Sequence, residues 1–178
     1  SSDVCSSDLI NTITCSDGST VATKSTSSAT LINQGEKLLT VSVEKIDGVF
    51  SSGEVIRYKV TYKNLADTRL TGVLLKVTLP QEVVFAGATA GNYDVMARTL
   101  TLSQDMIDPY TEGVILITAN VVKDAPIGKT IVTNVYAMYT VPGTKTQDEV
   151  TAYVVGSITP TQTISNQDTG AKKVIGKS

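Results

Sequence analysis

The sequence predicts an all-β protein, a packed sandwich or barrel of short antiparallel strands. Three observations favour this fold class. Thr and Val, which favour extended strands, are frequent throughout the chain, as is Ser. Apolar and polar residues alternate over short runs, and turn-forming residues separate these runs. No stretch keeps the 3.6-residue period of an amphipathic helix over about 11 residues or more.

The first nine residues, SSDVCSSDL, are predicted to be foreign to the gene. One nucleotide string that encodes them, AGTTCAGACGTGTGCTCTTCCGATCT, resembles a widely used synthetic sequencing adapter. We therefore expect residues 1–9 to be adapter-derived, the chain to be a fragment of a longer gene, and Cys5 to be non-native. Cys15 is then alone, and we expect a small buried residue rather than a disulfide partner or a nucleophile.

Residues 10–32 are predicted to form a β-hairpin. Its arms are Ile10–Cys15 and Thr20–Ile32, and Asp17-Gly18 supplies the turn. The polar residues 33–36 then interrupt the pattern.

Two alternating strands follow. In Leu38–Ile46, one face carries Leu39, Val41 and Val43. After the turn signal Asp47-Gly48, the strand Glu54–Lys63 alternates more clearly. One of its faces is charged or carries Thr, and the other is apolar and aromatic, formed by Ile56, Tyr58, Val60 and Tyr62. This pattern predicts a strand with one buried and one wet face.

The middle of the chain is predicted to contain shorter elements. The strand Leu70–Leu79 ends at Pro80, which cannot donate a ladder hydrogen bond. A short strand Val83–Phe85 follows, and then a short hairpin of Tyr93–Met96 and Arg98–Leu102.

The last part contains a long strand and a final hairpin. Gly113–Val122 is largely apolar on both faces, which predicts a central strand of a packed sandwich. Lys129–Tyr139 and Thr144–Val155 form the hairpin around 141–143. The alternation then stops, so residues 157–178 are expected to be a flexible tail.

Residues 11–32 resemble residues 134–155 in pattern, since each begins with Asn and contains two strands around a turn. This similarity predicts a tandem array. Residues 10–35 would be the terminal hairpin and linker of a preceding repeat, and residues 36–156 one complete domain. The alternative is that any two hairpins share such a pattern.

Residues 52–64, SGEVIRYKVTYKN, together with Leu79-Pro80 and Thr133-Asn134, resemble a bacterial and archaeal surface repeat catalogued as the eleventh "domain of unknown function". The resemblance covers about residues 38–155. Val77 stands where the family usually has Asp, and residues 109–113 replace its Pro-Gly pair. The resemblance implies an Ig-like antiparallel sandwich of about seven strands, in a non-catalytic module of long cell-surface or secreted proteins.

Composition excludes several function classes. The net charge of −2 argues against nucleic-acid binding, which needs a basic face. The chain has no His, so sites that depend on imidazole are excluded. No apolar run is long enough for a membrane-spanning helix. We expect no enzyme activity, no catalytic or metal-binding residues and no cofactor.

Two pairs of carboxylates, Asp105 with Asp108 and Asp148 with Glu149, are candidates for a catalytic pair. Asp148 and Glu149 are adjacent, so they should point to opposite faces of a strand. The oxygen-rich loops 64–67 and 105–108 are candidate calcium sites, but neither has an ordered ligand spacing. Solvated turns are the simpler interpretation.

Two further possibilities concern single side chains. An isopeptide cross-link would need Lys59 or Lys63 beside Asn134, with Glu54 as the carboxylate, but a side chain of Asn134 that ties a turn to the backbone explains its position equally well. A glycan platform would need exposed aromatics, whereas Tyr58 and Tyr62 are expected in the core.

The sequence therefore predicts a structural or adhesive module of a prokaryotic surface or secreted multi-repeat protein. Its expected partners are neighbouring repeats or copies of itself, with surface proteins or glycans as further possibilities. One alternative is a filament subunit in which a segment near residues 20–46 adds to a sheet edge of another copy. A carbohydrate-binding module is a further alternative.

Overall fold

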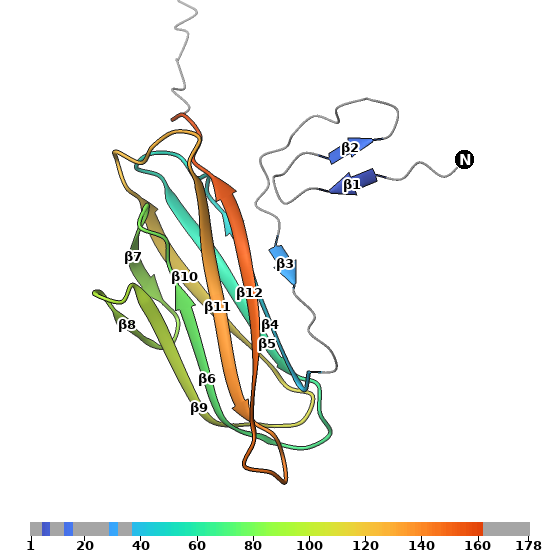
Figure 1. Cartoon of the computed structure of the whole chain (residues 1–178). Helices are drawn as coiled ribbons and strands as arrows, with labels where there is room; N and C mark the ends of the chain where they lie inside the picture. The colour runs from blue at the N-terminus through green and yellow to red at the C-terminus, as the bar shows by residue number, and fades with distance from the viewer. Residues whose placement is uncertain (1–4, 8–12, 16–28, 32–36, 162–178) are drawn as a thin grey trace, which may run out of the picture.

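The structure, a computed structural model, describes residues 5–7, 13–15, 29–31 and 37–161. Over these residues the protein is all-β, and two antiparallel sheets pack face to face as a sandwich (Figure 1). The predicted fold class is thus confirmed. Within the described ranges no helix is long and apolar enough to cross a membrane.

The first sheet has four strands, in the order β4-β5-β10-β7. Their bounds are Leu39–Asp47 for β4, Val55–Asn64 for β5, Glu112–Val121 for β10 and Val83–Ala88 for β7. The second sheet has the order β3-β12-β11-β6-β9-β8. Its bounds are Ala29–Leu31 for β3, Gln147–Ser157 for β12, Thr130–Thr140 for β11, Leu70–Thr78 for β6, Thr99–Ile107 for β9 and Asn92–Asp94 for β8.

The layout, in which four strands face five strands and the added β3, is Ig-like. From β4 to β12 the sandwich has nine strands rather than about seven, because the segment 83–107 supplies three of them. Two predicted strands are also longer in the structure. The strand predicted at Val83–Phe85 extends to Ala88, and β9 extends to Ile107, since its second half continues to pair with β6 as far as Leu70.

The core lies between the sheets and comes from the alternating positions that the sequence indicated. Tyr58, Ile56 and Val60 of β5 are fully buried, whereas Tyr62 is half-buried against the core. β10 is central in its sheet, as predicted, but only one of its faces is buried. Its other face carries Val114 and Leu116, which are exposed.

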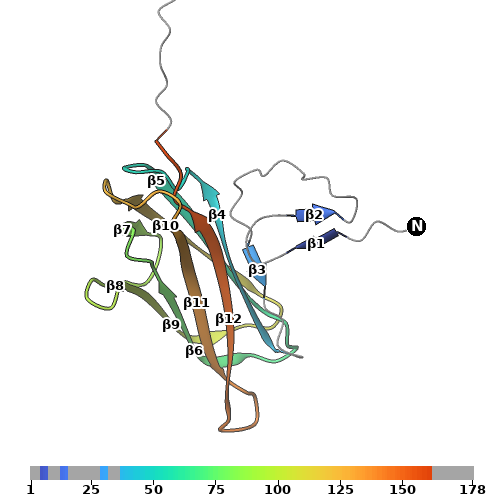
Figure 2. The same ribbon diagram turned by 45° about the horizontal axis from the view of Figure 1, so that its top comes forward.

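The sandwich has two ends, which we name by their contents. The hairpin end holds the start of β4, the β11–β12 turn and the loops around 65–69 and 108–111. The tail end holds the loops 48–54, 79–82 and 122–129 and the residues after β12. There, Thr159 N donates to Phe50 O (2.7 Å) and Gly128 N to Ile158 O (2.8 Å). β4 thus begins at the hairpin end, and β12 finishes at the tail end (Figures 1 and 2).

The segment before β4 differs from the predicted hairpin. Ile13–Cys15 (β2) pairs antiparallel with Cys5–Ser7 (β1). Ala29–Leu31 (β3) pairs antiparallel with β12 of the sandwich. Short strands without a sheet of their own pair with whichever edge is within reach. The predicted turn at Asp17-Gly18 and the part of the predicted tail beyond residue 161 lie outside the described residues. The tail was predicted to begin at residue 157, but β12 runs to Ser157 and Ile158 is buried in the core, so the sandwich extends further than predicted.

Two glycines allow aromatic rings to lie directly on the sheets. Gly113 of β10 pairs with Tyr62 of β5, and a Cβ at Gly113 would overlap the Tyr62 ring. A Cβ at Gly156 of β12 would likewise overlap the ring of Phe50, which closes the tail end. The absence of a side chain at these two positions therefore lets Tyr62 and Phe50 pack against the backbone.

Candidate functional site

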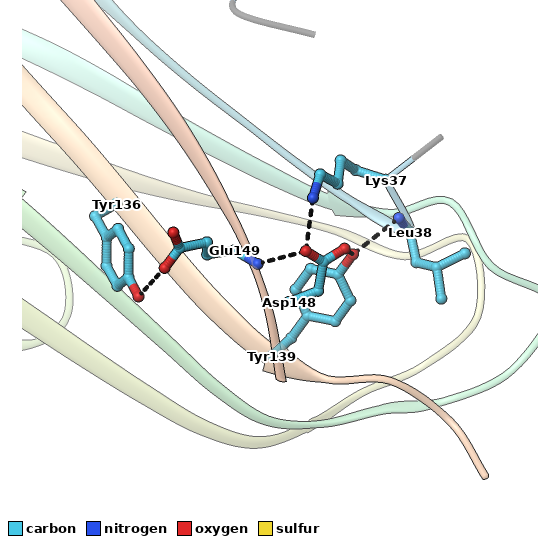
Figure 3. A network of polar contacts seen from close by, with 6 residues as sticks. All are labelled: Lys37, Leu38, Tyr136, Tyr139, Asp148 and Glu149. Atoms are coloured by element: carbon cyan, nitrogen blue, oxygen red, sulfur yellow. Dashed lines mark hydrogen bonds and ion pairs between the residues drawn. The ribbon is translucent and has the colours of Figure 1, made fainter. Parts of the chain in front are cut away.

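A network of polar contacts at the hairpin end forms the cluster that we call the clasp (Figure 3). It consists of Lys37, Leu38, Tyr139 and Asp148. The Lys37 ammonium donates to Asp148 Oδ1 (2.6 Å), and the Tyr139 hydroxyl donates to Asp148 Oδ2 (2.9 Å). The Leu38 amide donates to the Tyr139 hydroxyl (3.1 Å). The clasp thus joins the beginning of β4 in one sheet to β11 and β12 in the other.

The charges of the clasp are matched. The hydrogen bond from Lys37 holds the pKa of Asp148 below its usual value, and the same bond raises the pKa of Lys37. Burial is the main cause of the raised pKa of Tyr139, which keeps its hydroxyl protonated as a donor. An ionised carboxylate with two strong donors is a poor general base. The geometry of the clasp therefore favours holding the sheets together.

Glu149, next in the chain, points to the other side of β12. It accepts a hydrogen bond from the Tyr136 hydroxyl (2.7 Å) on the outer face, and this bond raises the pKa of Tyr136. The prediction that Asp148 and Glu149 face opposite ways is thus confirmed (Figure 3). Of the other carboxylate pair, Asp105 is exposed on β9, while Asp108 is paired with Arg69 (2.7 Å).

The two loops considered for calcium lie side by side, and a buried amide fills the space between them. Asn64 is fully buried. Its Nδ2 donates to the carbonyl oxygens of Thr68 (2.9 Å), Ile107 (3.1 Å) and Asp108 (3.0 Å), and its Oδ1 accepts from Ala66 N (2.8 Å). These three carbonyl oxygens, which could otherwise bind a cation, thus accept hydrogen bonds from the side-chain amide of Asn64. No group of three or more Cys, Asp or Glu in the described ranges is placed to hold a metal ion.

The tail end has its own charged group, which sequence reasoning missed. Glu82, nearly buried, forms an ion pair with Lys129, and the hydrogen bond from Lys129 lowers the pKa of Glu82. Arg98 has a φ of 53°, in the left-handed region, and donates to the carbonyls of Pro80 (2.7 Å) and Val83. Arginine is uncommon at positive φ, so no residue pattern pointed to this turn.

The isopeptide arrangement is excluded by the sheet topology. Lys59 and Lys63 lie on β5, and Asn134 lies on β11, which belongs to the other sheet. Lys59 points to the outer face of its sheet, where it pairs with Glu44 (2.9 Å). Asn134 is exposed on the opposite outer face, in the middle of its strand rather than at a turn. Both the cross-link and the turn-tying role proposed for Asn134 were therefore wrong.

Of the two tyrosines predicted for the core, Tyr58 is inside and Tyr62 is half-buried against it. Tyr58 has no exposed surface, and burial raises its pKa to about 12, an effect that the neighbouring Thr133 hydroxyl partly offsets. Among the described residues, none lies at hydrogen-bond geometry to the Tyr58 hydroxyl. Tyr62 is half-buried under the same sheet. These two residues therefore do not form an exposed platform for sugars. Cys15 lies in β2, and its side chain is outside the described structure.

No protein-family model and no curated protein matches this chain. Solved structures do. The GAE domain of GGA2p from Saccharomyces cerevisiae is 18% identical, with a TM-score of 0.45 over 71% of this chain and 94% of that one. The major pilin SpaD from Corynebacterium diphtheriae is 13% identical, with a TM-score of 0.49 over 66% of this chain and 35% of the pilin. The bacterial hydrophobin BslA is 12% identical, with a TM-score of 0.44 over 71% of this chain and 98% of BslA. These are likenesses of fold alone.

Proposed function

We propose that the sandwich is a non-catalytic structural or adhesive module of a prokaryotic cell-surface or secreted multi-repeat protein. One observation carries the proposal: β4 begins at the hairpin end, and β12 finishes at the tail end. A chain that enters and leaves a domain at opposite ends can place copies of that domain in a line. Strands of the length of β12 span about 35 Å, which is the spacing that each copy would add.

The contacts at the two ends suit a module that bears load. At the hairpin end, the clasp fixes Lys37 and Leu38 to the β11–β12 hairpin. At the tail end, Thr159 and Ser51 form a parallel bridge, and Ile158 N donates to Lys129 O (2.9 Å). Tension applied to the first and last strands therefore meets a group of polar contacts at each end before it reaches the core. The resemblance of residues 38–155 to surface repeats supports the same role.

The test is to pull the whole chain, placed between two reference domains, in a single-molecule force experiment. We expect one abrupt unfolding event that releases about 400 Å of chain, because about 120 residues lie between the clasp and the bridge. Asp148→Asn should lower the unfolding force, whereas Glu149→Gln, the same change one residue along and outside the clasp, should not. Gradual extension without a distinct event would contradict the proposal, since a spacer must stay folded under tension.

A further inference from the structure

A β-sheet edge that is straight and unprotected pairs readily with another strand, and most edges of this sandwich are protected. β8 has three residues. The pairing of β7 with β10 is interrupted by a register shift at Thr118 and Ala119. β4 carries Glu44, Lys45 and Asp47 near its end, and its pairing with β5 shifts register there. Short length, irregularity and charge are the usual means by which proteins prevent pairing at an edge.

The outer edge of β12 has none of these features along most of its length. Its inner edge pairs with β11 in one uninterrupted register, from Gln147 opposite Thr140 to Ser157 opposite Thr130. The stretch 150–157 contains no charged residue and no proline. The outer edge therefore offers a long, regular row of backbone donors and acceptors to an added strand.

A strand of this chain is paired at that edge. β3 runs antiparallel to β12 and lies beside it in both views (Figures 1 and 2). The register places Thr30 opposite Tyr153, with Ala29 opposite Val154 and Leu31 opposite Ala152. Among the residues that the structure describes, β3 pairs with three of the eleven residues of β12.

We propose that the outer edge of β12 is a strand-acceptor site whose occupant is the Ala29–Leu31 segment of a second copy of this chain. A segment from another copy makes the same backbone pairing as the chain's own segment. The balance between pairing within one chain and pairing between two chains is therefore set by protein concentration and by the connection from Ala29–Leu31 to β4. The proposal is independent of load bearing, because it concerns the side of the sandwich and not its ends.

Disulfide trapping in the full chain tests the register and the source of the strand. All variants carry Cys5→Ser and Cys15→Ser. One copy carries Thr30→Cys, and a second, differently tagged copy carries Tyr153→Cys. Tyr153 alternates with the buried Ala152 and Val154, so a cysteine there leaves the core intact. The two copies are mixed, oxidised and separated under non-reducing conditions. Since each copy has one cysteine, a disulfide between the two tags arises only between chains.

The matched control replaces the acceptor with Asn92→Cys, an exposed position on β8 at the opposite edge of the same sheet. We expect the 30–153 pair to give roughly tenfold more mixed dimer than the 30–92 pair, with a yield that rises with concentration. A chain with both Thr30→Cys and Tyr153→Cys reports the internal pairing. An internal disulfide without mixed dimer at several hundred micromolar protein would overturn the second copy as occupant. No 30–153 disulfide in either format would overturn the acceptor site itself.

Discussion

The amide of Asn64 is predicted to be one of the strongest single contributors to the stability of the sandwich. Asn64→Leu keeps a similar volume and removes all four hydrogen bonds of the buried side chain. The Asp108 carbonyl oxygen still accepts a hydrogen bond from the Thr111 hydroxyl (2.7 Å). Losing the bond from Asn64 therefore costs this carbonyl little. The Thr68 and Ile107 carbonyls and the Ala66 amide lose a partner, each at about 1 to 1.5 kcal/mol. The expected loss is therefore about 3 to 4.5 kcal/mol, a large part of the total for a domain of this size.

The assay is urea unfolding followed by far-UV circular dichroism. At a typical slope, the expected loss lowers the midpoint by about 2 M urea. Asn134→Leu is the matched control, because Asn134 is exposed in the middle of β11. We expect the control to change the free energy of unfolding by no more than about 0.5 kcal/mol. Equal midpoints for the two variants would refute the role assigned to the buried amide.

Asn64→Asp separates this role from metal binding. It places a carboxylate oxygen against the carbonyls that Nδ2 now contacts, so the variant should be destabilised at neutral pH. Added calcium should not raise the unfolding midpoint of the natural sequence. If calcium restored the stability of Asn64→Asp, the two adjacent loops would be able to hold a cation, and the interpretation of the site would change.

Five further variants, in three comparisons, test other contacts by their effect on the stability to unfolding. Tyr58→Phe removes an unpartnered buried hydroxyl and should be neutral or stabilising, whereas Tyr139→Phe removes two hydrogen bonds and should cost about 1 to 2 kcal/mol. Gly113→Val should cost about 1 to 3 kcal/mol by displacing the tyrosine ring, while Gly87→Ala, with open space around it, should cost little. The pKa of Asp148 is lowered by folding, so its stabilisation is complete above the unfolded pKa and is lost as the pH falls through the folded pKa. Asp148→Asn should therefore weaken the loss of stability as the pH falls below the ordinary pKa of an aspartate, and an unchanged acid profile would contradict the clasp.

The fold was predictable wherever one face of a strand is buried. β5 is the clearest case, because the alternation from Ile56 to Val60 places every apolar residue inward. β9 was predicted too short, since its second half carries Gln104 and Asp105, and pairing with β6 rather than alternation extends it to Ile107. The pairing of Ala29–Leu31 was not predicted, because a free strand pairs with the edge within reach.

The candidate site was only partly predictable. The opposite directions of Asp148 and Glu149 followed from strand geometry alone. The sequence correctly indicated that the loops at 64–67 and 105–108 are polar. In the structure, backbone groups of these loops form hydrogen bonds with the buried side-chain amide of Asn64. A sequence does not distinguish an Asn that binds a cation from one that donates to carbonyls, since the difference lies in which backbone atoms surround it. The clasp includes contacts between residues more than 100 positions apart, such as the hydrogen bond from Leu38 to Tyr139. No local sequence pattern reveals such contacts.

The distance along the chain between the partners of the clasp has a consequence for synthesis. Lys37 and Asp148 are 111 residues apart. A ribosome that adds about 5 to 20 residues per second needs roughly 5 to 20 s to pass from one to the other. During that time β4 has left the ribosome while the hairpin that will hold its beginning does not yet exist. The nascent chain therefore exposes an apolar strand for seconds, and chaperone binding to the β4 region is expected to end when β12 emerges.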